Sequence, residues 1–317
     1  MLMKRILTLT ILMFCSVILF SNSFDYNGIR YEISSANSEE CILLQNISQK
    51  GDVVIPSVVV NAGKEYIVTS VADYAFNGCV DITTVAIPGT VKRIGNLAFY
   101  ACDNLKSISI SDGIEQIGNW AFAECLSLEE LVIPKTVVYL GTGFAASNDN
   151  LKTVIIEADI KLIRKSSFED CKKLGKVQLP ATVQVIESKA FERCESLETM
   201  ELPLSLIEIG ESAFYMSGLK EINIPNSEAI IGDNAFAYCK QLQKAVLPTS
   251  LKRLGDGLFF NCTQLVDVLI PEGVTHIGMN AFNGCTALKE LYIPESVTHI
   301  GLDALSGCDN LENLIMP

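Results

Sequence analysis

The 317-residue chain has almost no histidine, with only His276 and His299. Nucleophilic catalysis assisted by an imidazole base therefore has almost nowhere to form. The chain also has no H-E-x-x-H zinc motif, G-x-S-x-G nucleophile elbow, P-loop or dinucleotide-binding glycine motif. Acidic residues are plentiful, so composition does not exclude a catalytic carboxylate pair, but such a pair needs a deep cleft. The sequence predicts a protein that is not an enzyme and binds no cofactor.

Basic residues are scarce as well. The chain has 24 Lys and Arg against 37 Asp and Glu, a formal net charge of −13. An acidic surface repels phosphate backbones and anionic lipids, which excludes nucleic acid and anionic membranes as good partners. The balance suits an exported protein, or one that meets a basic patch on a partner.

Long apolar runs are absent with one exception near the start of the chain. Lys4 and Arg5 precede a 15-residue apolar stretch, residues 6–20, and small residues follow up to Ser23. This order is typical of a secretory signal peptide. The stretch reaches about 22 Å as a helix, less than the ~30 Å hydrocarbon core, which disfavours an uncleaved anchor. We predict residues 1–23 as a signal peptide, a secreted or cell-surface location, and no membrane insertion after cleavage.

What the sequence has instead is an internal repeat of roughly 23 residues over residues 67–317, with the pattern A-F-x-x-C-x-x-L-x-x-V-x-I-P-x-x-V-x-x-I-G. Self-similarity at a fixed period predicts a solenoid, in which each unit buries its apolar side against its neighbours. The interval between phenylalanines departs from 23 only around Phe144 and between Phe214 and Phe236. The anchor residues are Phe76, Phe99, Phe122, Phe144, Phe168, Phe191, Phe214, Phe236, Phe259 and Phe282, with Leu305 in the last slot.

Each repeat is predicted to contain two strands and a turn. Leu291 and Ile293 alternate with polar or outward residues, the period of a half-buried strand, and a proline ends the run. The V-x-x-I-G segment is the second element, and we expect its glycine to adopt a left-handed conformation. The A-F-x-x-C segment is long enough for one helical or 3₁₀ turn. The fold class predicted is a solenoid of about eleven 23-residue coils of short parallel strands with short helical or 3₁₀ turns.

Residues 24–66 do not follow the repeat. They alternate apolar and polar residues, and Asn27-Gly28 and Asn61-Ala62-Gly63 supply turn residues. A terminal unit of a solenoid needs an atypical outer face. We therefore predict an N-terminal β-rich cap at 24–66, joined without a Pro/Gly/Ser-rich linker to the repeats at 67–317.

The repeat pattern resembles the BspA-like, or Treponema-type, class of leucine-rich repeats over about four-fifths of the chain. The cap resembles the segment that precedes such arrays in exported proteins of Bacteroides-type bacteria. The resemblance implies a leucine-rich-repeat solenoid in a secreted or cell-surface protein. It also implies an adhesin-like role, because some members bind host matrix proteins or other bacteria.

Three columns of the repeat are predicted to be structural. The phenylalanines follow small residues, which favours a buried spine over an aromatic binding track. Nine cysteines stand three residues after that column, with Ser147 and Ser217 in the other two slots. Stacked Cβ atoms about 4.8 Å apart exceed the ~3.8 Å that a disulfide prefers, so we expect buried thiols. His276 and His299 stand one repeat apart, but two ligands make a poor site, and we predict no metal.

The outward strand positions offer the candidate binding site. One outward column ends in four apolar residues, and a charged column runs beside it. Apolar patches rimmed by charge often mark interaction sites, although β-branched and aromatic residues are also good strand formers. The predicted binding residues are Val246, Leu269, Tyr292, Ile315, Lys244, Asp267 and Glu290.

The last coil carries a further expectation. The repeat stops at Pro317, one strand into a coil, so Leu311, Leu314 and Met316 are expected to lie under an edge with unpaired backbone groups. Either a protein ligand covers this patch, or the chain forms a homodimer through its C-terminal rungs.

The repeat from Thr142 to Lys165 departs most from the pattern. It has Gly143, Ser147 and Arg164 where other repeats have Ala, Cys and Gly. Stability in a solenoid is roughly a sum over units and interfaces, so we expect this unit to open locally.

The leading hypothesis is a secreted or cell-surface module that binds a protein ligand, either a host matrix protein or another cell-surface protein, through the sheet face of the solenoid. The alternative is a non-catalytic structural or assembly component of a surface complex. The sequence does not identify the ligand.

Overall fold

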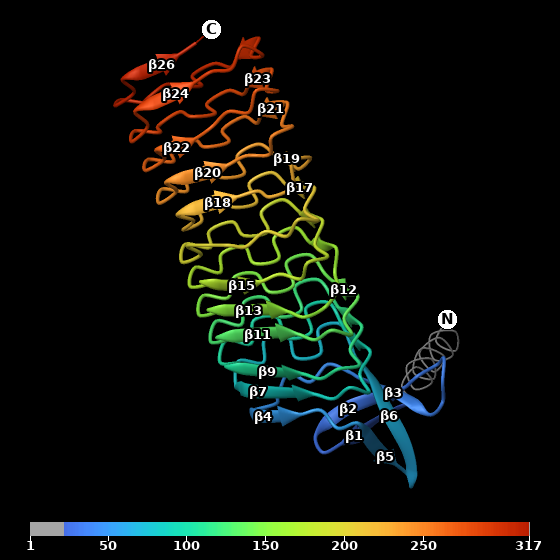
Figure 1. The fold of residues 1–317 in the computed structure, drawn as a ribbon. Coiled ribbons are helices and arrows are strands. Elements are labelled where there is room, and N and C mark those ends of the chain that lie inside the picture. Colours follow the sequence, from blue (N-terminus) through green and yellow to red (C-terminus); the bar gives the residue numbers. More distant parts are fainter. Residues whose placement is uncertain (1–21, 317) are drawn as a thin grey trace, which may run out of the picture.

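The computed structural model describes residues 22–316. It is a β-solenoid of about twelve turns that extends from a cap at its blue end to the red end of the chain (Figure 1). Each turn, called a rung below, places one segment on either side of the solenoid, and in most rungs these segments are a long strand on one side and a short strand on the other. The predicted fold class is confirmed. The predicted signal peptide lies outside the described residues except for Asn22 and Ser23, and Ser23 is the first residue of β1.

The cap is a mixed sheet. β1 (Ser23–Tyr26), β2 (Ile29–Ile33) and β3 (Glu40–Leu43) are antiparallel, and β5 (Val58–Asn61) forms a hairpin with β6 (Lys64–Val71). β3 also pairs in parallel with β6, and β4 (Gly51–Val54) pairs in parallel with the first strand of the repeats. Residues 40–54 therefore make one irregular turn ahead of the roughly eleven predicted from the repeat.

Long strands line one side of the solenoid, called the long-strand face. They form four parallel sheets, β4-β7-β9, β11-β13-β15, β18-β20-β22 and β24-β26. Facing residues are one repeat apart, as in Thr84 with Ser107. After β4, the strands are β7 (Ile82–Ile87), β9 (Ser107–Ile110), β11 (Glu130–Ile133), β13 (Thr153–Ile156), β15 (Lys176–Gln178), β18 (Glu221–Asn223), β20 (Lys244–Val246), β22 (Asp267–Val268), β24 (Glu290–Tyr292) and β26 (Asn313–Ile315).

Two-residue strands from the V-x-x-I-G segments line the short-strand face. They continue from β6 through β8, β10 and β12, and then form the sheets β14-β16-β17-β19 and β21-β23-β25. These strands are β8 (Arg93–Ile94), β10 (Gln116–Ile117), β12 (Tyr139–Leu140), β14 (Leu162–Ile163), β16 (Val185–Ile186), β17 (Glu208–Ile209), β19 (Ile230–Ile231), β21 (Arg253–Leu254), β23 (His276–Ile277) and β25 (His299–Ile300).

The A-F-x-x-C segments form runs of turns, and residues 22–316 contain no helix, in contrast to the predicted helical or 3₁₀ turn. These turns also bond rung to rung. The N–H groups of Leu97, Phe99 and Ala101 donate to carbonyls of the next rung at 2.8–3.0 Å. Leu97 and Ala101 have positive φ, 50° and 55°. Left-handed residues on both sides of the phenylalanine thus turn alternate N–H groups along the solenoid axis.

The glycine that ends V-x-x-I-G has no positive φ, which corrects the prediction made for it. Its role is close approach between rungs. A Cβ at Gly118 would lie 2.6 Å from the backbone nitrogen of Asn96 in the preceding rung, a distance that no carbon atom tolerates. The glycine column is interrupted at Arg164 and Glu187.

The phenylalanine column is a buried spine, as predicted. All ten rings are fully buried. They stack face to face from Phe76 to Phe122 and again from Phe168 to Phe282, with centroids 5.1–5.9 Å apart. Between these two runs, Phe144 meets Phe168 edge-on, at 5.3 Å and 75°. The order of the spine therefore changes at Phe144.

The backbone explains this change. The N–H of Phe122 donates to the carbonyl of Phe144, just as the N–H of Phe99 donates to the carbonyl of Ala121. Phe144 therefore occupies the alanine slot of its rung, and Ala145 occupies the phenylalanine slot. The two side chains are exchanged while the 23-residue backbone period is kept. The intervals of 22 and 24 residues do not mark a deletion and an insertion.

The same rung corrects the assignment of its cysteine slot, which belongs to Asn148 rather than to Ser147. The Asn148 amide donates to the carbonyl of Phe122 at 2.9 Å, where the Cys125 thiol donates to the carbonyl of Phe99 at 3.1 Å. Asn148 is fully buried and also accepts a hydrogen bond from the Cys125 N–H. A neutral polar side chain thus makes the bonds that a thiol makes in other rungs.

Candidate binding surface

The residues predicted to bind a ligand all lie on or beside the long-strand face, and all are exposed. The apolar members range from 36% exposed at Tyr292 to 69% at Leu269. Lys244 Nζ lies 2.8 Å from Asp267 Oδ2, which makes an ion pair between β20 and β22. The face therefore presents large apolar side chains beside charged ones.

The structure divides these residues into two groups. Val246 lies on β20 beside the Lys244–Asp267 pair, whereas Tyr292 pairs with Ile315 between β24 and β26. β22 ends one sheet and β24 begins another, and Leu269 lies just beyond the end of β22. The apolar column is thus not one continuous ladder.

A feature that sequence reasoning missed lies next to the first group. A groove of about 950 Å³ opens on the long-strand face between the rung of residues 199–202 and β18. Val246 and Lys244 form part of its wall, so it is continuous with the predicted surface. This hollow, called the mid-array groove, is lined by Thr199, Met200, Glu201, Leu202, Glu221, Ile222, Asn223, Pro225, Lys244 and Val246.

The groove lies where the backbone pairing between successive long strands is interrupted. Residues 199–202 occupy a long-strand position but form no strand, and within residues 22–316 their backbone makes no hydrogen bond to β15 or β18. The turn that leads into β18 is one residue shorter than in other rungs. It brings Gly218 so close to the preceding rung that a Cβ there would lie 2.1 Å from the Glu195 carbonyl oxygen. The 22-residue interval between Phe214 and Phe236 was the available signal.

The rim of the groove is acidic. Glu201 and Glu221 are exposed, and neither forms an ion pair with another described residue. The charge of Lys244, the basic residue of the wall, is balanced by its ion pair with Asp267. The hydrogen bond to Asp267 and the charge of that carboxylate raise the pKa of Lys244, so the ammonium stays charged and paired. The groove therefore has a local excess of negative charge.

Two smaller hollows lie on the short-strand face, again at breaks in a ladder. One of about 290 Å³ separates β12 from β14, and one of about 400 Å³ separates β19 from β21. Arg164 lines the first and Arg253 lines the second. The mid-array groove and these two hollows thus each lie where rung-to-rung pairing is interrupted.

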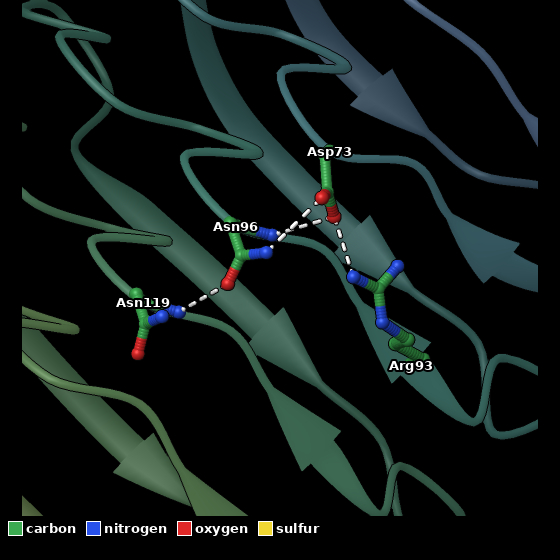
Figure 2. Close-up of polar contacts among 4 residues, drawn as sticks. All are labelled: Asp73, Arg93, Asn96 and Asn119. Carbon is green, nitrogen blue, oxygen red and sulfur yellow. Dashed lines mark hydrogen bonds and ion pairs between the residues drawn. The ribbon is translucent and has the colours of Figure 1, made fainter.

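A polar ladder beside the short strands joins the first rungs of the array (Figure 2). Asp73 accepts hydrogen bonds from the N–H and the amide of Asn96, at 2.9 and 3.0 Å, and from Arg93 at 2.5 Å. Asn96 Oδ1 accepts from the Asn119 N–H at 2.9 Å, and Asn119 Oδ1 accepts from the Thr142 N–H at 2.8 Å. Each side chain satisfies a backbone donor of the next rung, so the ladder is structural.

The cysteine column consists of free thiols, and no disulfide joins cysteines among the described residues. Burial raises the pKa of Cys79, Cys171 and Cys239 to about 12. Seven of the nine column thiols donate to a phenylalanine carbonyl of the preceding rung, for example Cys194 to Phe168 at 3.2 Å. Cys171 donates to the carbonyl of Ala145, which occupies the phenylalanine slot of its rung, and Cys79 donates to the carbonyl of Asn46 in the cap. The high pKa and the burial describe packed, unreactive thiols, as predicted.

The two histidines are stacked. Their rings lie 4.5 Å apart at 2°, and Nδ1 of His276 lies 2.8 Å from the hydroxyl of Thr275. Across residues 22–316, no group of three or more His, Cys, Asp or Glu side chains is placed to hold a metal ion. The same residues contain no helix long and apolar enough to cross a membrane.

The coils, the stacked phenylalanine spine and the strand columns define a leucine-rich-repeat solenoid. The model of the BspA type leucine rich repeat region (6 copies) matches residues 69–197, 161–285 and 207–317. The chain belongs to this family, which agrees with the resemblance seen in the sequence.

Solved structures agree with this assignment. A leucine-rich repeat protein from Bacteroides ovatus is 26% identical, with a TM-score of 0.60 over 92% of this chain and 94% of that one. A leucine rich cell surface protein from Faecalibacterium prausnitzii is 24% identical, with a TM-score of 0.54 over 92% and 94%. The pneumococcal vaccine antigen PcpA is 18% identical, with a TM-score of 0.53 over 92% and 87%. No curated protein matches the chain.

Proposed function

We propose that this protein is an exported, adhesin-like binding module that recognises a protein ligand through its long-strand face, without catalysis. The observation that carries the proposal is the row of exposed apolar residues on that face, flanked by charge and continuous with the mid-array groove. A solenoid presents an extended surface of this kind to partners. Large exposed apolar patches rimmed by charge are typical of interaction sites.

Membership of the BspA type family supports this role. Export is supported by the basic and apolar order of residues 4–20, and by the cell surface protein of Faecalibacterium prausnitzii, which shares the fold. The ligand we propose is a host matrix protein or another cell-surface protein. Association of two copies through the C-terminal rungs is a second use of the same face, because Tyr292 and Ile315 are exposed there.

The proposal is tested by binding of the purified full chain to a panel of immobilised extracellular-matrix proteins and to envelopes of the producing cell. Leu269→Glu with Tyr292→Lys should weaken binding to whichever panel member the parent binds at least about tenfold, because charges would have to be desolvated in an apolar contact. The control is Val138→Glu with Ile207→Lys, which charges two exposed apolar residues of the opposite face.

Equal binding by the parent and by the Leu269/Tyr292 variant would contradict recognition through this face. Binding to cell envelopes alone, with none to matrix proteins, would favour an assembly component of a surface complex. Sedimentation of the parent and of the same variant tests the dimer, which should dissociate on charging the face.

A further inference from the structure

Within the proposed function, the mid-array groove has features that identify a kind of partner. We propose that it binds an extended, basic peptide segment of a partner protein, which adds its backbone to the free edge of β18. This inference rests on the proposed role as a protein-binding module and specifies both the chemistry of the ligand and how it is held.

The first argument is the backbone. β18 pairs with β20 on one side only, in the register Glu221 with Lys244 and Asn223 with Val246. Its other edge faces residues 199–202, which make no ladder bond to it. Unpaired N–H and C=O groups along a strand edge are a template for a further strand. Of the free edges on the long-strand face, the β18 edge opens on the groove.

The second argument is size and lining. The volume of about 950 Å³ is at the upper end of the ~300–1,000 Å³ of ligand pockets. This volume is large enough for a peptide of a few residues. Met200 and Ile222 line the groove from the core side, at 9% and 1% exposure. Alternate side chains of an added strand point to opposite faces, so one set meets this apolar floor and the other faces solvent.

The third argument is charge. Glu201 and Glu221 stand at the groove without an ion-pair partner among the described residues, and Lys244 is held by Asp267. A peptide with Lys or Arg at its outward positions complements this rim, whereas an acidic peptide is repelled. Apolar residues at alternate positions and basic residues between them are therefore the expected sequence.

The probe for this site is a phage library of linear hexapeptides, selected on the full chain and then synthesised with a fluorescent label. Enriched peptides should be basic, with alternating apolar residues. In fluorescence anisotropy, Glu201→Lys with Glu221→Lys should weaken their binding at least about tenfold. The matched control is Glu130→Lys with Glu157→Lys, an equal change of charge at exposed residues outside the groove, and it should bind with affinity within about twofold of the parent.

Backbone pairing is tested on the same peptides by N-methylation at alternate residues, in both registers. Loss of binding in one register, or in both, supports strand addition, because N-methylation removes the donors that a ladder needs. Unchanged binding in both registers overturns it. Failure to enrich basic peptides, or equal binding to both charge variants, also overturns the inference. Ligand binding that depends on Leu269 and Tyr292 would survive that failure, so the proposed function is tested separately.

Discussion

Residues 73–142 and residues 143–223 carry the same repeat, yet they build different surfaces. In the first region glycine closes each short strand, the rings of Phe76 to Phe122 stack, and the ladder from Asp73 to Asn119 satisfies successive rungs. In the second region, Arg164 and Glu187 replace glycine, Phe144 exchanges slots, and one long strand is missing. The groove and one of the smaller hollows lie in or beside this second region.

The two regions differ in side chains but share the backbone geometry of the rung. Backbone hydrogen bonds run through the turns at Phe144 with the same spacing as in regular rungs. Each rung contacts only its neighbours, so an irregular rung is absorbed locally instead of unwinding the array. Irregular rungs are therefore one place where this fold acquires concave surface, as at the mid-array groove and the hollow between β12 and β14.

The largest effect is expected for the spine. Phe236→Ala should lower the free energy of unfolding by about 3–5 kcal/mol, because it removes a fully buried ring and leaves a cavity. Phe144→Ala should also lower the free energy of unfolding, but by about 0.5–1.5 kcal/mol less than Phe236→Ala does. The reason is that Phe236 stacks on two rings, whereas Phe144 meets one ring edge-on. Urea unfolding followed by circular dichroism measures both. A loss below about 1 kcal/mol at Phe236 would contradict burial of the spine.

The glycine column gives the next largest effect. Gly118→Ala should lower stability by about 1–3 kcal/mol, because the new Cβ overlaps the backbone of Asn96. At the equivalent position of the irregular region, Arg164→Ala should lose less than about 1 kcal/mol. Its contacts are a 4.7 Å approach to the Tyr139 ring and a 4.0 Å approach to Glu187, both partly exposed. A neutral Gly118→Ala would show that the rungs do not touch at this column.

The polar ladder predicts a smaller, pH-dependent effect. Burial alone would raise the pKa of Asp73, but hydrogen bonds from Arg93 and Asn96 outweigh it and hold the pKa below 3.8. A lowered folded-state pKa stabilises the protein above the unfolded value, and this stabilisation is lost as pH falls through the folded value. Asp73→Asn should therefore lower stability by up to about 1 kcal/mol at pH 7, and this loss should shrink progressively as the pH falls below the ordinary range of an aspartate.

The control for Asp73→Asn is Asp159→Asn, which removes an exposed carboxylate that forms no ion pair within the described residues. It should change stability by less than about 0.5 kcal/mol at pH 7 and at lower pH. A pH-independent loss for Asp73→Asn would contradict the assignment of the effect to the charged form.

The smallest effect is local and requires hydrogen exchange. Amides of residues 199–202 have no ladder partner, so they should exchange faster than those of residues 244–246, which are paired in β20. Exchange in residues 142–165 should also be faster than in residues 236–300, as predicted from the sequence. Uniform protection along the long-strand face would contradict the distinction between regular and irregular rungs.

The period alone predicts most of the fold, because a solenoid repeats one set of contacts. It places the phenylalanine spine, the buried cysteines and the outward column correctly. The spacing of phenylalanines gave the wrong slot for Phe144, because every phenylalanine was assumed to occupy the phenylalanine slot. From spacing alone, an exchange with Ala145 cannot be distinguished from a change in the length of the repeat. The conformation predicted for the glycines was also wrong, because close approach to a neighbouring rung requires glycine just as a left-handed turn does.

The surface was predicted less well than the core. The outward column can be predicted from the sequence because side chains alternate between the two faces of a strand. The missing strand at residues 199–202 cannot, because it depends on whether hydrogen bonds form between two particular rungs. The shortened turn at Gly218, which leads into β18, is visible in the sequence, but its effect on strand pairing is not. The contribution of β3 and β4 to the array was hidden for a similar reason, since parallel pairing across a bulge leaves no periodic signal.

The cysteine column affects whether unfolding of the protein is reversible. Eight of the nine repeat cysteines are buried and Cys308 is half-buried, so an oxidant meets few accessible thiols while the rungs stay closed. When several neighbouring rungs open together, a row of thiols is released at once, and their pKa values fall back toward the ordinary range. In an oxidising medium, cross-linking between molecules then competes with closing. Unfolding becomes irreversible under those conditions, and the working lifetime of the protein is set by the rate of opening rather than by the equilibrium free energy.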